Sequence, residues 1–282
     1  MSYAEDIASF LKVNDKHRYY STLVIDKKHR SDMQSLYAFN AEISAIGLRV
    51  NEPASGEIRL KFFSDLLEGE GRGDISSNPI ASNFLALLKK HNLTIAPLVR
   101  LIEARRFDLY SDVMPDKKSF EGYAGETSSL LYQYSAMIIN DGAPIENGDA
   151  AGHLGVAHAL IGHILSLGFN ASRGRVFLPF EVFQAFGVSE QQLFEGKASE
   201  QLDAALESFC EMAGEHLNKA RLAIKTVPKN TRPAFAYISV LDKQLSKLRR
   251  NNNSATLLTQ SPNSLSDMQI MGQLILWSMF KK

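Results

Sequence analysis

The stretch GHILSLGFNASRGRVFLP, residues 162–179, begins with a helical pattern and ends in a basic turn and a short extended run. Gly174 lies between two arginines, where a residue without a side chain permits a tight turn. A helix followed by such a turn is typical of the wall of a pocket that holds anions. Yet the segment contains no aspartate and no glutamate. The sequence therefore predicts a pocket wall from which the expected acids are missing.

The helix that leads into this stretch, from about 151 to 168, has two distinct faces. Its apolar stripe is Leu154, Ala157, Ile161 and Ile164. A second stripe is small and polar, and consists of Ala159, Gly162, Ser166 and Asn170. The segment 36–48 also has a face of mixed size, formed by Tyr37, Ala41, Ser44 and Leu48. Small residues favour either close helix packing or a cavity that the two helices share.

Helical spacing continues along most of the chain. One long apolar stripe predicts a helix of six turns, and its members are Leu202, Leu206, Phe209, Ala213, Leu217, Ala220 and Ile224. The segments 81–91 and 97–109 also have helical patterns, and VFLP at 176–179 is the one short extended candidate. The sequence predicts a single all-α domain over residues 1–282, with about ten helices and short connections.

Composition excludes several classes of protein. Lysine plus arginine equals aspartate plus glutamate at 31 each, which gives no indication of a nucleic-acid partner. Cys210 is the only cysteine, as suits a reducing compartment. The N-terminal MSYAEDIASF resembles no secretory or transit signal. The apolar segment 268–280 is too short to span a bilayer. These features predict a cytoplasmic protein.

Three motifs resemble the squalene/phytoene synthase family: YAFNAEISAI at 37–46, LGVAHALIGHIL at 154–165 and SRGRVFLP at 172–179. The similarity continues through KTVPKNTRPAF at 225–235. The resemblance implies an isoprenoid-synthase helical bundle around a central cavity. Enzymes of the family join two prenyl diphosphates head to head, and two aspartate-rich motifs on facing helices hold Mg²⁺ against the diphosphates.

The chain departs from the family at those aspartates. Aligned on RGRVFLP, the aspartates of the second motif fall on Ser166 and Asn170. Aligned on YAF, the first-motif acids fall on Ser44, Ala45 and Leu48, and Glu42 is the nearest remaining acid. Neutral hydroxyls and amides do not replace several carboxylates around a hard divalent cation. We therefore expect no catalytic residue, no metal ligand and no cofactor.

Other segments resemble a branch of the family that includes respiratory complex I assembly factors with a phytoene-synthase domain. They include FNAEISAIGLRVNEP, YAGETSSLLY and GVSEQQLF. The resemblance implies a pseudoenzyme that acts in the biogenesis of complex I. Mitochondrial members of the branch carry a targeting segment, and because the N-terminal stretch does not resemble one, a bacterial relative is expected. Its expected partner is a complex I subunit or an assembly intermediate, and a peripheral contact with the inner membrane is also expected. The segment DMQIMGQLILWSMFKK at 267–282 suits either a membrane surface or a partner helix, although packing on its own core is favoured.

Two alternatives remain open. The first is a Mg²⁺-dependent head-to-head prenyl diphosphate transferase of the phytoene or squalene synthase type, with a redistributed metal site at Glu42, Asp108 and Asp112. The second is an isoprenoid- or lipid-binding protein that holds apolar tails alone. Because Met114-Pro115 follows closely, we expect Asp108 and Asp112 to be solvated or to cap a helix.

Candidates for lining the cavity follow from the faces, the turn and the resemblance: Tyr37, Glu42, Ser44, Ser129, Gln133, His163, Ser166, Asn170 and Arg175. Arg175 is the expected contact if anion binding survives. His153, His158 and His163 recur every five residues, and each step turns the side chain by about 140°. They are therefore not expected to converge on a metal. In GETSSLLYQY, Thr127 or Ser128 is expected to cap a new helix behind Gly125.

Overall fold

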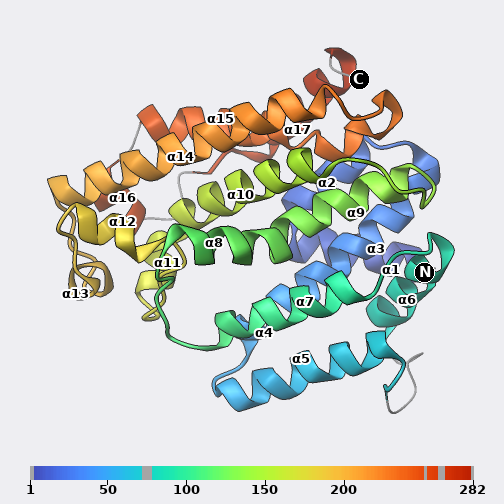
Figure 1. The fold of residues 1–282 in the computed structure, drawn as a ribbon, viewed down its shortest axis with the longest axis horizontal. Coiled ribbons are helices and arrows are strands. Elements are labelled where there is room, and N and C mark those ends of the chain that lie inside the picture. Colours follow the sequence, from blue (N-terminus) through green and yellow to red (C-terminus); the bar gives the residue numbers. More distant parts are fainter. Residues whose placement is uncertain (1–2, 72–77, 251–252, 260–263, 281–282) are drawn as a thin grey trace.

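The computed structural model describes residues 3–71, 78–250, 253–259 and 264–280, and Figure 1 shows their arrangement. The first half of the chain forms α1 (Tyr3–Asn14), α2 (Lys16–Leu23), α3 (Lys27–Ser44), α4 (Ile46–Arg49), α5 (Pro53–Glu68), α6 (Pro79–Lys90), α7 (Ala96–Ala104), the 3₁₀ segment η2 (Arg105–Leu109), α8 (Lys117–Ala124), the π segment η3 (Gly125–Ser129) and α9 (Leu130–Ile139). The second half forms α10 (Gly148–Leu165), α11 (Leu167–Ala171), α12 (Phe180–Ala185), α13 (Glu190–Phe194), α14 (Glu200–Ile224), the 3₁₀ segment η4 (Lys229–Phe235), α15 (Ile238–Arg250), α16 (Ser254–Thr259) and α17 (Asp267–Phe280).

The predicted all-α class is confirmed. In the described part of the chain, extended pairing is limited to an isolated parallel bridge between Val113 and Val176. Val176 opens the VFLP run that the sequence predicts to be extended. The bridge ties the segment before α8 to the segment before α12, and so brings residues of the basic turn close to η2.

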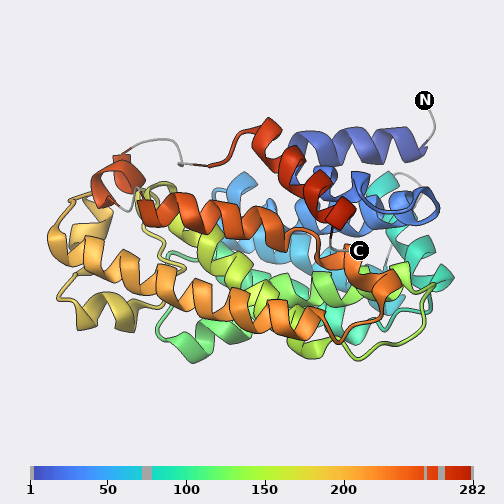
Figure 2. The same cartoon turned by 90° about the horizontal axis from the view of Figure 1, so that it is seen from above.

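The long helix α14 packs along α10, as Figures 1 and 2 show from two directions. Every residue of the two predicted apolar stripes is buried: Leu154, Ala157, Ile161 and Ile164 on α10, and Leu202, Leu206, Phe209, Ala213, Leu217, Ala220 and Ile224 on α14. Full burial of a large aliphatic side chain contributes about 1.5–3 kcal/mol. The α10–α14 pair is thus a principal part of the core.

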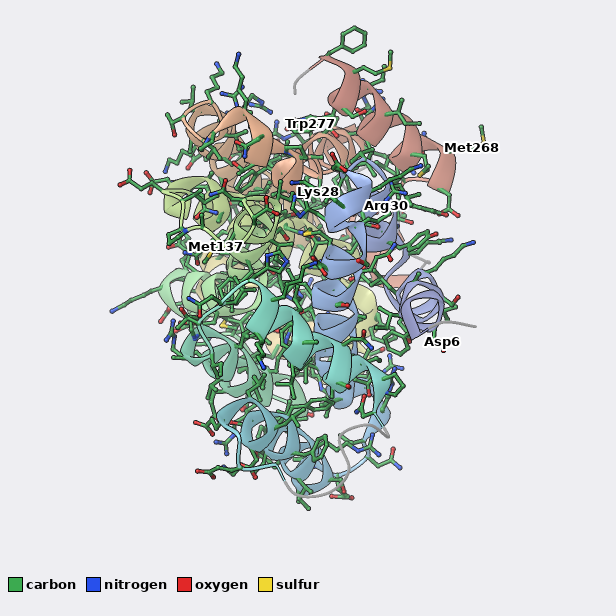
Figure 3. The ribbon with its side chains drawn as sticks, turned by 90° about the vertical axis from the view of Figure 1, so that its right-hand side faces the viewer. Asp6, Lys28, Arg30, Met137, Met268 and Trp277 are labelled. Atoms are coloured by element: carbon green, nitrogen blue, oxygen red, sulfur yellow. The ribbon has the colours of Figure 1, made fainter. Side chains whose placement is uncertain are left out.

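The remaining helices form layers on either side of this pair. α9 packs against both α3 and α10, while α5 lies at the opposite edge of the molecule from α15 and α17 (Figure 1). α17 packs on α15 and α2, with Trp277 directed inward and Met268 directed away from the protein (Figure 3). Residues at the C-terminal ends of α3 and α10 nevertheless line a common cavity.

The predicted cap at Thr127 or Ser128 is wrong. α8 continues through η3 into α9, and Thr127 Oγ1 donates to the carbonyl of Tyr123 at 2.6 Å. That bond to the preceding turn satisfies a buried hydroxyl without ending the helix. A π segment widens the helix locally, and such segments are frequent near functional sites.

Two predicted helices end earlier than their apolar patterns indicate. The helix expected to reach about 168 ends at Leu165, and α11 begins at Leu167. The helix expected over 97–109 ends at Ala104 and tightens into η2. At the first break, Gly168 lies against α16. A Cβ on Gly168 would come within 2.5 Å of the Leu258 carbonyl oxygen, so contact between distant segments sets this helix direction.

Gly155→Ala should lower the free energy of unfolding by about 1–3 kcal/mol, the usual cost of overpacking. The added Cβ would lie 2.1 Å from Ser129 Oγ and 2.4 Å from Ser129 N, so α10 would have to move away from η3. Gly152→Ala is the matched control, because its Cβ would meet nothing within 4 Å. We expect that change to raise the free energy of unfolding by about 0.5–1 kcal/mol, because alanine has a higher helix propensity than glycine. Chemical denaturation measures both, and equal effects would contradict the close contact.

Candidate functional site

A cavity of about 220 Å³ opens where the C-terminal ends of α3 and α10 meet η2 and α8. Its lining consists of Ser44, Gly47, Leu48, Arg105, Asp108, Tyr123, His163, Ser166, Phe169, Asn170, Arg175 and Phe177. Pockets for drug-sized ligands usually measure about 300–1,000 Å³. In the described conformation, the cavity is therefore small for a pair of prenyl chains.

A buried ionic cluster forms one wall of the cavity. Arg105 Nη1 donates to Asp108 Oδ2 at 3.1 Å and to the Tyr123 hydroxyl oxygen at 2.8 Å. The Tyr123 hydroxyl in turn donates to Asp108 Oδ1 at 2.6 Å. Asp108 is only 8% exposed, so the expectation that it is solvated or caps a helix is wrong. Arg105 and Asp108 are three residues apart, which is one turn of the 3₁₀ segment η2. Both side chains therefore lie on the same side of η2, toward the interior.

Burial is the largest influence on the pKa of each group in this cluster, although it does not decide the direction of every shift. It raises the pKa of the Asp108 carboxyl, although Arg105 and the two hydrogen bonds act in the opposite direction. Burial also raises the pKa of the Tyr123 hydroxyl well above its ordinary value. For Arg105, burial opposes the charge, but Tyr123 and Asp108 outweigh it and raise the pKa. The three groups are thus each other's principal partners in a region of low polarity.

The basic turn supplies a second guanidinium. Gly174 has a φ of +68°, in the left-handed region that favours glycine, and Arg175 Nη1 donates to the Gly47 carbonyl at 3.2 Å. Among the described residues, Arg105 Nε and Arg175 Nε are buried and have no hydrogen-bond partner. The lining therefore carries two guanidinium groups and one carboxylate, which reverses the sign expected for an acid-rich metal site.

His163 adds a neutral aromatic surface. Its ring stacks on Phe177, with the centroids 4.7 Å apart and the planes 4° from parallel. Burial, with a smaller effect from Arg105, lowers the pKa of His163 to about 3, so the ring is uncharged at neutral pH. The expectation that the three regularly spaced histidines do not converge is confirmed. His158 Nδ1 pairs with the Tyr132 hydroxyl at 2.8 Å, and His153 Nδ1 pairs with His216 Nδ1 at 3.1 Å.

Five of the residues predicted from the sequence line the cavity: Ser44, His163, Ser166, Asn170 and Arg175. The hydroxyls turn back to their own helices, since Ser44 Oγ donates to the Ala41 carbonyl and Ser166 Oγ to that of Gly162. Asn170 Nδ2 donates to Ser166 Oγ at 3.0 Å, so these two side chains share one face. That any of the five binds a ligand stays a prediction.

The other four predicted residues lie outside this lining. Tyr37 is buried and pairs with Ser135, with 2.9 Å between their hydroxyl oxygens, and Glu42 Oε2 accepts from Arg49 Nη1 at 2.8 Å. Ser129 Oγ donates to the Gly152 carbonyl at 3.1 Å, in the contact between η3 and α10. Gln133 is exposed on α9.

Sequence reasoning missed the two residues that hold Asp108, namely Arg105 and Tyr123. The spacing of Arg105 and Asp108, three residues apart, is a signal that could have indicated an ion pair. Tyr123 comes from another helix, and no local pattern marks it.

The cavity does not fit the magnesium site that the resemblance implies. Asp108 is the only carboxylate in the lining, and both its oxygens accept hydrogen bonds from Arg105 and Tyr123. Mg²⁺ needs near-octahedral oxygen ligands and is usually bound through one or two free carboxylates together with substrate phosphates. Within the described ranges, no group of three or more histidine, cysteine, aspartate or glutamate side chains is arranged to hold a metal.

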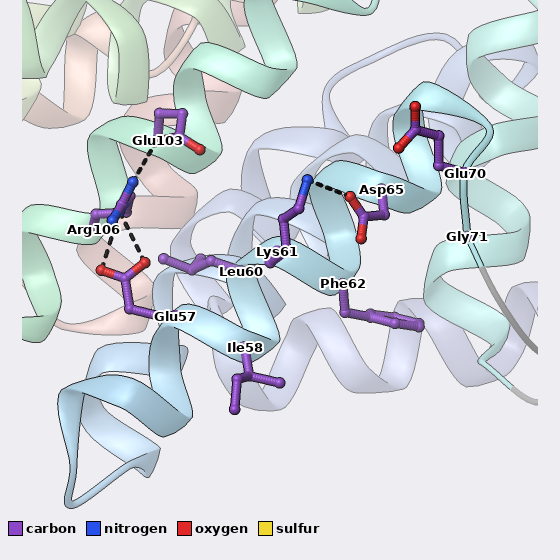
Figure 4. A pocket seen from close by; sticks show the side chains of 10 residues that line it. All are labelled: Glu57, Ile58, Leu60, Lys61, Phe62, Asp65, Glu70, Gly71, Glu103 and Arg106. Carbon is purple, nitrogen blue, oxygen red and sulfur yellow. Dashed lines mark hydrogen bonds and ion pairs between the residues drawn. The ribbon is translucent and has the colours of Figure 1, made fainter.

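A larger open groove of about 950 Å³ lies along α5 and α7 (Figure 4). Both of its cations are paired with carboxylates: Arg106 Nε lies 2.9 Å from Glu57 Oε2, and Lys61 Nζ lies 2.6 Å from Asp65 Oδ1. Ile58 and Phe62 on α5 are exposed beside them. The groove has the character of an ordinary protein surface, and we assign it no chemistry.

Polar aromatic side chains pack between α2, α10 and the residue that precedes α15. The rings of His158 and Tyr237 are stacked with centroids 5.0 Å apart, and the Tyr237 hydroxyl pairs with His17 Nδ1 at 3.1 Å. Nearby, Arg18 Nη1 donates to Asp15 Oδ2 at 2.6 Å. Burial lowers the pKa of His158 well below its ordinary value, so its ring is neutral. The polar side chains in this part of the interior therefore have partners among one another.

A sequence profile described as squalene/phytoene synthase matches residues 11–267. The human "NADH dehydrogenase (ubiquinone) complex I, assembly factor 6" is 28% identical over 242 residues, which cover 85% of this chain and 72% of the human protein. The 15-cis-phytoene synthase of Synechococcus elongatus is 24% identical over 177 residues, or 58% of each chain.

Solved structures show the same fold at lower identity. A dehydrosqualene synthase superposes with a TM-score of 0.80 at 20% identity, covering 98% of this chain and 96% of that one. A squalene synthase from Alicyclobacillus acidocaldarius superposes with a TM-score of 0.73 at 16% identity, covering 89% and 94%. At these identities the likeness extends to the fold alone.

Proposed function

Because this chain belongs to the squalene/phytoene synthase family but has a cavity without free carboxylates, we propose that it is a non-catalytic member that acts in the assembly of respiratory complex I. The observation that carries the proposal is a combination. Complex I assembly factors from human and cattle match this chain over 72% of their own length, and the one lining carboxylate is held by Arg105 and Tyr123. Neither fact alone would separate an assembly protein from an enzyme.

The partner is a subunit or an assembly intermediate of complex I. We place the protein in the bacterial cytoplasm, at the periphery of the inner membrane. Among the described residues, no helix is long and apolar enough to cross a bilayer. A peripheral contact would bring the protein close to a complex that is assembled at the membrane.

The two alternatives have less support. A head-to-head prenyl transferase with acids at Glu42, Asp108 and Asp112 would need these side chains to converge. Glu42 is paired with Arg49, Asp108 is buried in its own cluster, and Asp112 is exposed. A carrier of isoprenoid tails would need a long apolar space, whereas the cavity measures about 220 Å³ and is lined partly by charged groups.

Deletion of the gene in its host should reduce assembled complex I, measured as the amount and NADH-oxidising activity of the complex on native gels. Restoring the wild-type gene should restore both. The matched control is Gln133→Ala, an exposed change outside the cavity, which should complement fully. Normal complex I in the deletion strain would remove the partner and the assembly role together.

A further inference from the structure

The C-terminal helix α17 is apolar on both faces. Its inner face packs into the core through Ile270, Leu274 and Trp277. The outer face presents large apolar side chains to the exterior, with exposed fractions of 86% for Met268, 46% for Ile275, 51% for Leu276, 67% for Met279 and 76% for Phe280. Single exposed apolar residues are ordinary, but a contiguous group on one helix marks an interaction site.

The outer face carries no charge. At about 100° per residue, the exposed residues fall within one arc of about 140°, opposite the buried ones. The only charged residue of the helix, Asp267, is at its first position and pairs with Lys16, with 2.8 Å between Asp267 Oδ2 and Lys16 Nζ. Figure 3 shows Met268 directed away from the protein and Trp277 directed into it.

Cationic groups gather beside the C-terminal end of α17. A hollow of about 470 Å³ there is lined by Arg221, Ile224, Lys225, Arg232, Ile238, Ser239, Asp242, Trp277 and Phe280. Asp242 accepts from Arg221 at 2.6 Å, whereas the Arg232 guanidinium donates to the carbonyls of Val227 and Lys225. Three cations therefore meet one carboxylate. The sequence continues after Phe280 with two more lysines.

We propose that the outer face of α17 docks on an anionic lipid bilayer, with the helix lying in the plane of the interface. Met279, Phe280 and Leu276 enter the boundary between headgroups and acyl chains, while Lys225 and Arg232 meet lipid phosphates. Burial of apolar side chains at the interface, together with cations that attract anionic lipids, is what holds a helix on a membrane surface. The proposal names the membrane contact on which the proposed function relies, but its test does not involve complex I.

A bilayer suits this surface better than a single protein partner. Apart from Gln269, whose Oε1 accepts from the backbone N–H of Ser266, the exposed side chains of α17 after Asp267 are apolar, and methionine adapts to irregular surroundings. A helix of 14 residues is about 21 Å long, which is less than the ~30 Å hydrocarbon core of a bilayer. α17 can therefore lie on a membrane but cannot cross it.

The test is flotation of the purified full-length chain with vesicles of phosphatidylcholine, with and without 30% phosphatidylglycerol (about 0.1 M salt). We expect binding to the anionic vesicles that weakens as salt is raised. Leu276→Glu with Met279→Glu should reduce the bound fraction at least about tenfold, and Lys225→Glu should reduce it at low salt. Ile58→Glu, at an exposed position on α5, is the matched control and should change nothing. Thermal melts verify that each variant is folded.

Three results would overturn the proposal. They are failure of the wild-type protein to float with anionic vesicles, equal binding by the double glutamate variant, and equal binding to neutral vesicles. Sedimentation velocity provides a fourth. If the wild-type chain is a dimer that the double variant makes monomeric, a second copy covers this face instead. Because no complex I is present, failure here leaves the gene-deletion result unaffected.

Discussion

Asp108→Ala should lower the free energy of unfolding by about 3–5 kcal/mol, the range found when one partner of a buried ion pair is removed. The change leaves Arg105 in a region of low polarity with one hydrogen-bond partner, the hydroxyl of Tyr123. The side chains of Arg105 and Asp108 are only 14% and 12% exposed, so water cannot readily replace the lost carboxylate. Chemical denaturation at neutral pH measures the loss.

Asp112→Ala is the matched control, because it removes the other carboxylate of DLYSD. Asp112 is exposed, and we expect a change within about 0.5 kcal/mol. A second variant, Arg105→Met with Asp108→Leu, removes both charges and should recover much of the lost stability. Similar losses for the two aspartates would contradict the buried cluster, as would a double variant no more stable than Asp108→Ala.

The sequence predicts the fold well because the signal is local and repeated. Each turn of α14 places an apolar residue on the same side, so the pattern alone locates the helix and its buried face. The same reasoning locates the buried stripe of α10. This reasoning fails at helix ends, because contacts with distant segments determine where a helix stops. Gly168 allows α11 to pack closely against α16, and no apolar periodicity near Gly168 predicts that contact.

The site is only partly predictable for the same reason. The faces that carry Ser44 and Ser166 can be located by counting along their helices. Asp108 could not be placed, because its environment depends on Tyr123 from another helix and on the inward direction of η2. Gln133 shows the reverse error. Gln133 is predicted to line the cavity but is exposed on α9, and the π segment before α9 shifts the helical phase that follows it.

The buried cluster also gives a physical reason why missing acids are tolerated. In a metal-dependent site, the cation offsets the repulsion among several carboxylates. Here Arg105 offsets a single carboxylate, and Arg175 adds a further positive charge. The lining thus has an excess of positive charge without a divalent ion. Several additional carboxylates in this space would need a cation from solution.

Restoring the acids with Ser44→Asp, Leu48→Asp, Ser166→Asp and Asn170→Asp should therefore make stability depend on Mg²⁺. All four positions line the cavity, and the hydrogen bond of 3.0 Å between Asn170 and Ser166 shows how close the new carboxylates would be. Without metal, the variant should melt below the wild type because like charges crowd one small space. In the presence of Mg²⁺, a prenyl diphosphate analogue at about 100 times its dissociation constant should raise the free energy of unfolding by ~2.7 kcal/mol. This corresponds to a rise in melting temperature of roughly 5–10 °C.

The wild-type chain should show no metal-dependent shift in the same thermal titration, because its lining offers no free carboxylate. The control variant carries Ser44→Asn, Leu48→Asn and Ser166→Asn, which add side chains of similar size without charge. Its melting temperature should not change with Mg²⁺. If wild-type protein were stabilised by the analogue only when Mg²⁺ is present, the non-catalytic proposal would fail and the prenyl transferase would regain support. If the four-aspartate variant ignored Mg²⁺ while remaining folded, the backbone around Ser166 and Leu48 would have to differ from a metal-binding arrangement. The loss of acids would then be one of several changes that separate this cavity from an enzyme's.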